Sequence, residues 1–223
     1  MPGSAGAEKR IIDIRHRIRQ FCQTHGLRVP ILLAPMAGAS APSLSVAVAN
    51  AGGLGACGCL LMQPDEIVAW ANEVRSQTNG PFQLNLWIPD PEPERDVEQE
   101  ARIRAFLSNW GPPVPPHAGD ARPPDFAKQC DTLLAAAPAA VSSVMGLYPP
   151  QFVEKLNAQG IKWFANISTA AEARAAEAAG ADVVVAQGAE AGGHRGCFDA
   201  AEAERQQVGL FSLLPAVVDA VRV

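Results

Sequence analysis

Short apolar runs alternate with amphipathic stretches along most of the chain, and this alternation predicts strands that are each followed by a helix. The expected strands cover 29–34, 54–61, 82–88, 139–145, 161–167 and 183–186. The expected helices cover 10–24, 41–50, 64–77, 92–110, 126–137, 153–159, 169–179 and 210–221. A series of this kind is typical of parallel βα units.

The strand count sets the fold class that we expect. A closed TIM barrel has eight strands and typically about 250 residues. Six strands in 223 residues therefore predict an α/β fold of the TIM (β/α)8 type, incomplete, with about six of the eight strands. We expect residues 1–28 to form a tail and a helix that caps one end, and residues 29–223 to form a partial βα barrel without the last two βα units.

The run 183–186 and the loop after it carry the densest candidate chemistry. The valines of 183–186 are typical of a strand that is buried on both faces. They are followed by a glycine-rich loop, 187–196. Ligands of α/β proteins lie on loops that leave the carboxyl ends of strands, where glycines allow close approach. This pattern makes Gln187, Gly192, Gly193 and His194 candidate ligand residues. A tight turn with a surface histidine is the alternative.

Two other strands offer candidate residues. The first one ends in Ala34, Pro35 and Met36 before Gly38, so we expect the backbone amides around Met36 to face a flat ligand. Asn85 lies inside an apolar strand and must find hydrogen-bond partners there. Either it points into the pocket toward a cofactor, or it bonds to neighbouring backbone.

Composition narrows the class of partner. A net charge of −5 argues against a nucleic-acid surface, which needs a basic excess. No apolar run is long enough to cross a bilayer. The five cysteines include one close pair, Cys57 and Cys59, for which burial as small hydrophobic residues is more typical than zinc binding. We therefore expect no metal, a small-molecule partner and the cytoplasm as location.

Three motifs together resemble a known family. The stretch 186–196, AQGAEAGGHRG, is similar to the signature of the nitronate monooxygenases, formerly called 2-nitropropane dioxygenases; 34–36 and the ANAGGLG of 49–55 resemble the same family. These enzymes are FMN-dependent TIM barrels. FMN-dependent enoyl-acyl-carrier-protein reductases are close relatives of theirs.

The resemblance implies a reaction and a set of roles. FMN would take electrons from an alkyl nitronate and pass them to dioxygen, which gives a carbonyl compound and nitrite. His194 would be catalytic, and Arg195 would anchor the loop in a pair with Glu190. The flavin would be contacted by Ala34, Pro35, Met36, Asn85, Gln187, Gly192 and Gly193.

Two other functions stay open. One is an FMN-dependent NAD(P)H enoyl-acyl-carrier-protein or quinone reductase, and the other is a noncatalytic remnant. The phosphate site of such barrels usually lies after the last two strands, whereas this sequence ends at Val223. We therefore expect weak FMN binding and marginal stability, with a homo-oligomer or other association through exposed barrel edges.

Overall fold

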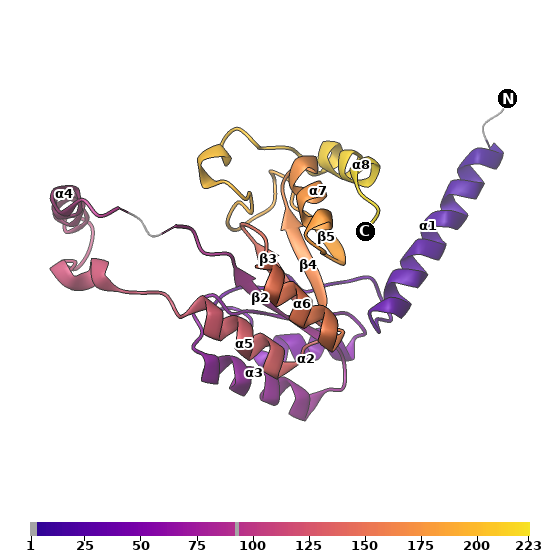
Figure 1. Ribbon diagram of the computed structural model, residues 1–223, viewed down its shortest axis with the longest axis horizontal. Helices are drawn as coiled ribbons and strands as arrows, with labels where there is room; N and C mark the ends of the chain where they lie inside the picture. Colours follow the sequence, from indigo (N-terminus) through magenta and orange to yellow (C-terminus); the bar gives the residue numbers. More distant parts are fainter. Residues whose placement is uncertain (1–3, 92–93) are drawn as a thin grey trace.

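The computed structural model describes residues 4–91 and 94–223. Its centre is a parallel sheet in which five strands follow one another in chain order. The strands are β1 (Gly55–Gly58), β2 (Phe82–Trp87), β3 (Ala140–Val144), β4 (Lys162–Ile167) and β5 (Val183–Ala186). This confirms the expected α/β class with βα units in series, and Figure 1 shows helices between successive strands.

The helices lie close to their predicted positions. They are α1 (Ser4–Thr24), α2 (Pro42–Asn50), α3 (Pro64–Gln77), α4 (Val97–Leu107), α5 (Phe126–Ala136), α6 (Pro150–Gln159), α7 (Ala170–Ala178) and α8 (Leu210–Ala220). Two short 3₁₀ turns, η1 (Pro116–Asp120) and η2 (Ala200–Glu202), lie in the loops. Prolines open α2, α3 and α6, where a fixed φ and a missing N–H cost nothing.

The first expected strand, 29–34, does not form. The segment makes only an isolated parallel bridge between Leu32 and Leu54, with Leu33 N donating to Leu54 O at 2.9 Å. Pro30 lies within the segment and Pro35 directly follows it, and a proline has no N–H to extend a ladder. The expectation of a full strand was therefore wrong, although the segment still follows the edge of β1.

The expected helix 92–110 is shorter than predicted. Residues 92 and 93 lie outside the described residues, and the helix begins at Val97 and ends at Leu107. Asp96 caps it by accepting a hydrogen bond from Gln99 N. Figure 1 shows α4 at the end of an extended arm, away from the sheet. Phe106 is accordingly exposed, so this helix adds little to the core.

The two faces of the sheet have different contents, because side chains alternate along each strand. Toward the helices lie Leu84, Leu86 and Val141 in one large apolar core. Trp163 belongs to the same face, and its indole donates to Ser143 Oγ at 3.0 Å. The opposite face corresponds to the inside of a barrel. It carries Leu54, Ala140 and Phe164 near the amino ends of the strands, and polar residues farther along.

The strand β5 is less buried than its sequence predicts. Val185 is 40% exposed, although the apolar run was expected to be covered on both faces. β5 pairs only with β4 within the sheet of the described residues, so one edge and part of its inner face remain open. The expectation of burial on both faces was wrong for this reason.

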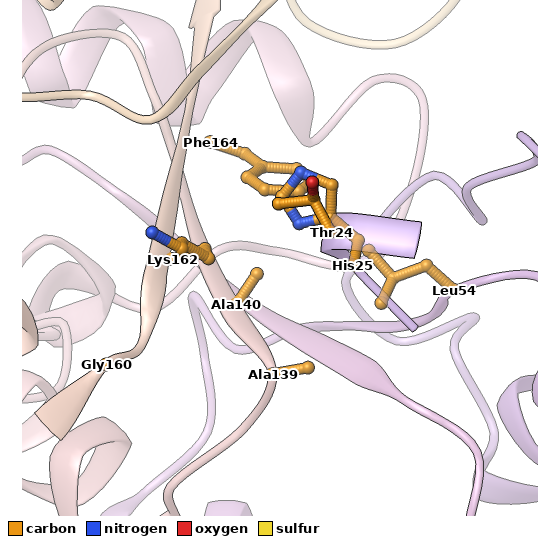
Figure 2. Close-up of a pocket in the computed structure, with 8 residues that line it drawn as sticks. All are labelled: Thr24, His25, Leu54, Ala139, Ala140, Gly160, Lys162 and Phe164. Carbon is orange, nitrogen blue, oxygen red and sulfur yellow. The ribbon is translucent and has the colours of Figure 1, made fainter. Parts of the chain in front are cut away.

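The last turn of α1 covers the amino ends of the strands. His25 packs between Phe21 and Phe164, with ring centroids 4.6 and 5.1 Å away. The rings of His25 and Phe164 line a cavity of about 140 Å³. Figure 2 shows them there with Lys162 and Ala140. Earlier turns of α1 project away from the sheet (Figure 1), and Ile14 and Ile18 are exposed. Only the end of the helix therefore lies near the sheet, and the capping role of residues 1–28 stays a prediction.

Burial and the nearby Lys162 lower the pKa of His25, and Asp182 opposes them. The unfolded chain, in which histidine titrates near pH 6.5, then binds more protons than the folded one as the pH falls. We predict that the free energy of unfolding in urea falls between about pH 7.5 and 5.5 more steeply for the wild type than for His25→Phe. The exposed His117 provides the control variant His117→Phe. Equal slopes for wild type and His25→Phe would contradict the prediction.

Candidate functional site

The carboxyl ends of the strands bring the candidate residues to one rim of the sheet. Ala37 forms a parallel bridge with Gly58 at the end of β1, and Gly58 pairs with Asn85 on β2. The loop 34–37 therefore borders Asn85. A Cβ on Gly58 would lie 2.6 Å from Ala37 N, so only glycine allows the loop to approach the strand this closely.

The amide of Met36 is not directed at a ligand. It donates to Ser40 Oγ at 2.9 Å, while Met36 O accepts from Ser40 N at 3.0 Å. These bonds close the turn that follows Pro35. The expectation that this amide faces a flat ligand was wrong, because the turn itself uses the donor. The Met36 side chain is 38% exposed and is the part of this loop left available for contact.

Asn85 bonds to its neighbouring strand. Its amide nitrogen donates to Ser142 O at 3.2 Å and to Ser142 Oγ at 3.0 Å. Tyr148 also donates to Ser142 O, at 2.9 Å. The amide nitrogen of Asn85 therefore bonds to neighbouring groups, as one of the two alternatives expected. The side chain still lies on the inner face of the sheet.

The loop after β5 is clamped by the side chain of Gln187. Its Nε2 donates to His194 O at 3.0 Å, and its Oε1 accepts from Gly196 N at 2.7 Å. A Cβ on Gly196 would lie 2.2 Å from Asn166 Nδ2 and 2.9 Å from Gln187 Oε1. A side chain at position 196 would therefore displace the Asn166 and Gln187 amides from their present positions.

His194 lies on the exposed surface of this loop. Its imidazole packs against the Trp87 indole at the end of β2, with ring centroids 4.6 Å apart and an interplanar angle of 66°. This contact joins the last strand to the second one across the rim. Gly192 and Gly193 precede it in open space, and Gly193 has a φ of +80°, which favours glycine.

Arg195 anchors the loop through backbone carbonyls. It donates to Gly188 O and Gln206 O, both at 3.0 Å. Glu190 instead accepts from Leu210 N at the start of α8, and hydrogen bonds from its own backbone amide and from Leu210 lower its pKa. The anchoring role is as expected, but the expected pair between Arg195 and Glu190 was wrong because each group binds backbone.

A second carboxylate fixes the far end of the loop. Glu172, 7% exposed, accepts from Ser168 N at 2.6 Å and from Phe198 N at 2.8 Å. It also forms a capping box with Thr169 at the start of α7. Because α7 follows β4, this carboxylate holds the loop after β5 to the neighbouring βα unit.

Two residues of the rim were missed by the sequence reasoning. Trp87 is the last residue of β2, and Asn166 lies near the end of β4. Trp87 is two residues after Asn85 on β2, and Asn166 is two residues after Phe164 on β4, so both lie on the inner face of the sheet. A polar residue within an apolar strand was the signal available for Asn166, and it is the same signal that singled out Asn85.

The cysteines are free thiols and buried, as expected for small hydrophobic residues. A hydrogen bond to Cys57 and burial raise the pKa of Cys59 far above its usual range, and burial raises that of Cys130 to about 12. Such thiols are poor nucleophiles.

Within 4–91 and 94–223, no group of three or more His, Cys, Asp or Glu side chains could hold a metal ion. No helix in those ranges has the length and apolar content to cross a membrane.

A parallel sheet with helices outside and polar loops at the carboxyl rim defines a βα protein of the TIM-barrel type. A structure of nitroalkane oxidase from Streptomyces ansochromogenes matches with a TM-score of 0.80 at 35% identity, over 90% of this chain and 58% of that one. FabK from Thermotoga maritima matches with a TM-score of 0.66 at 25% identity, over 92% and 51%. The TIM-type class is thereby confirmed.

Sequence comparison gives the family. The nitronate monooxygenase family model matches residues 20–223, so the chain belongs to that family. The nitronate monooxygenase of Pseudomonas aeruginosa is 40% identical over 81% of this chain and 53% of its own length. That of Paraburkholderia phytofirmans is 37% identical over 84% and 52%. The chain thus spans about half the length of these curated relatives.

The Gln187 clamp can be tested by proteolysis. In Gln187→Ala the loop loses both side-chain bonds, so we predict faster tryptic cleavage after Arg195 than in the wild type. Gln187→Glu keeps an acceptor for Gly196 N but no donor for His194 O, and should fall between the two. Cleavage after the exposed Arg205 is the internal control. Unchanged cleavage at Arg195 in Gln187→Ala would show that the loop does not depend on the clamp.

Proposed function

We propose that the protein to which this chain belongs is an FMN-dependent oxidoreductase that oxidises alkyl nitronates with dioxygen to a carbonyl compound and nitrite. The observation that carries the proposal is the position of the family's histidine loop. His194, Asn85 and the loop 34–37 share the carboxyl rim of a TIM-type sheet, which is where such folds bind ligands.

The rim suits the ring system of a flavin. Its inner face offers amide side chains, and the exposed Gly192 and Gly193 have nothing within 4 Å of an added Cβ, which leaves room for a flat group. We propose that Ala34, Pro35, Met36, Asn85, Gln187, Gly192 and Gly193 border the flavin, Gln187 through its place on the loop rather than through its engaged amide. The bound flavin would supply the redox chemistry.

His194 provides the proton chemistry in this proposal. A neutral imidazole nitrogen can accept the α-proton of a nitroalkane, and an imidazole N–H can donate a hydrogen bond to an anionic nitronate oxygen. The exposed position of His194 allows a substrate to reach the ring from the solvent side. Arg195 and Glu190 bind backbone and therefore support the loop rather than the substrate.

Thiols and an exposed strand edge bear on where the proposed enzyme lies and with what it associates. Five free thiols are typical of a reducing compartment, which supports a cytoplasmic location. The open edge of β5 supports association through exposed strands, either with another copy of the chain or with other parts of the whole protein. The partners proposed are small molecules, a nitronate and dioxygen.

We predict that His194→Gln lowers nitrite formation from a neutral nitroalkane by about 10²–10⁴-fold, because general-base catalysis contributes that much. Nitrite formation from preformed propyl nitronate should fall far less, since its α-proton is already removed. The matched control is His117→Gln on the exposed turn η1. Equal nitrite formation by wild type and His194→Gln from the neutral nitroalkane would contradict the role of His194, and no nitrite from either protein would favour the noncatalytic alternative.

Flavin binding is tested separately from turnover. The sequence expectation of weak FMN binding remains a prediction, and titration of the purified 223-residue chain with FMN, followed by absorbance and fluorescence quenching, measures it. A dissociation constant below about 1 μM, which is about 8 kcal/mol of binding free energy, would contradict it. Anaerobic stopped-flow reduction by NADPH, compared with propyl nitronate, then distinguishes the reductase alternative from the proposed oxidation.

A further inference from the structure

The side chain of His194 has one neighbour that could fix its direction. Its carbonyl is held by Gln187, but this bond fixes only the backbone. Across the described ranges no hydrogen bond of the imidazole itself is recorded, and the contact that it makes is the tilted packing on Trp87 at 4.6 Å. An exposed histidine held only at its backbone would sample several rotamers.

Trp87 is, by contrast, on a fixed support. It is the final residue of β2 and is half-buried, and its Cα is paired with Val144 on β3. The next residue, Ile88, donates its N–H to Val144 O at 3.0 Å. Ile88 also packs against Gly146, where an added Cβ would lie 2.9 Å from the Ile88 Cβ. The indole therefore extends from a backbone that is paired with β3.

The geometry of the pair is an attractive one. Aromatic rings prefer tilted or offset arrangements with centroids about 4.5–7 Å apart, and the observed distance of 4.6 Å and angle of 66° fall within that preference. The contact also connects two elements that are distant in sequence, the end of β2 and the loop after β5. It thus runs from an exposed side chain of the loop to a residue of a paired strand.

We propose that Trp87 is a positioning residue for His194, with its indole ring setting the direction in which the imidazole presents its nitrogens at the rim. The proposal that this orientation serves proton transfer rests on the proposed function. The ring contact itself does not. A proton acceptor must lie within hydrogen-bond reach of the proton that it removes, so a freely rotating His194 would be productive for only part of the time.

The first test needs neither flavin nor substrate. In the full chain with ¹³C-labelled histidine rings, the four histidines give four Cε1–Hε1 signals, and the signal missing from His194→Gln belongs to His194. We expect this signal to be displaced by the ring current of Trp87 and to show a nuclear Overhauser effect to indole protons. The absence of both in the wild type would overturn the proposal without any substitution at Trp87.

Three variants then separate positioning from a general effect on folding. Trp87→Leu should return the His194 signal toward the position of an exposed histidine, and Trp87→Phe should keep much of the displacement because a ring remains. Trp110→Leu is the matched control, since Trp110 is 79% exposed and contacts Phe106 rather than a histidine. A His194 signal that is unchanged in Trp87→Leu would overturn the proposal.

Turnover gives the second readout. With a neutral nitroalkane, Trp87→Leu should lower kcat at least tenfold with a smaller change in KM, and Trp87→Phe should recover most of the loss. If the ring contact is observed but wild type and variants form no nitrite, the positioning stands and the proposed function fails. If nitrite forms and Trp87→Leu retains full kcat, the positioning role is overturned while the function stands.

Discussion

The rim of this sheet depends on the two hydrogen bonds of one amide, that of Gln187. A loop that leaves a parallel strand has unpaired backbone groups, and buried ones must find partners. Gln187 supplies a donor to His194 O and an acceptor to Gly196 N, so a single side chain closes the loop around the histidine. The absence of a Cβ at residue 196 leaves the Gln187 amide room to lie against this loop.

Along each strand, alternate residues face opposite sides of the sheet. One set of alternate residues fills the core beneath the helices, as Leu84 and Leu86 do, and the other set faces inward, as Asn85 and Trp87 do. A one-residue shift in register would exchange the two sets. The positions of the candidate residues are therefore fixed by the burial of leucines that never contact a ligand.

Periodicity predicted the regular part of the fold because burial decides it. The helix 64–77 and the strand 183–186 have the predicted bounds. The strand expected at 29–34 does not form because Pro30 and Pro35 lack the backbone N–H groups that a ladder needs. An apolar pattern does not take these missing donors into account. The expected contacts of Met36 and Arg195 were wrong for a related reason. A motif shows which polar groups are close in sequence, but it does not show which backbone atoms the folded loop brings to them.

Those backbone demands determine what the rim can offer a ligand. Within the described part of the chain, Gln187, Arg195, Glu190 and Met36 N are all engaged in closing loops or capping helices. Among the described residues of the rim, the Asn85 carbonyl oxygen, the Asn166 amide and the Trp87 indole N–H have no hydrogen-bond partner, and neither has the buried Arg195 Nε. Among these neighbours, His194 carries a ring in which one nitrogen can accept a proton while the other donates a hydrogen bond. The proposed reaction therefore assigns the proton to His194, while the uncommitted amides and the indole contribute only hydrogen bonds.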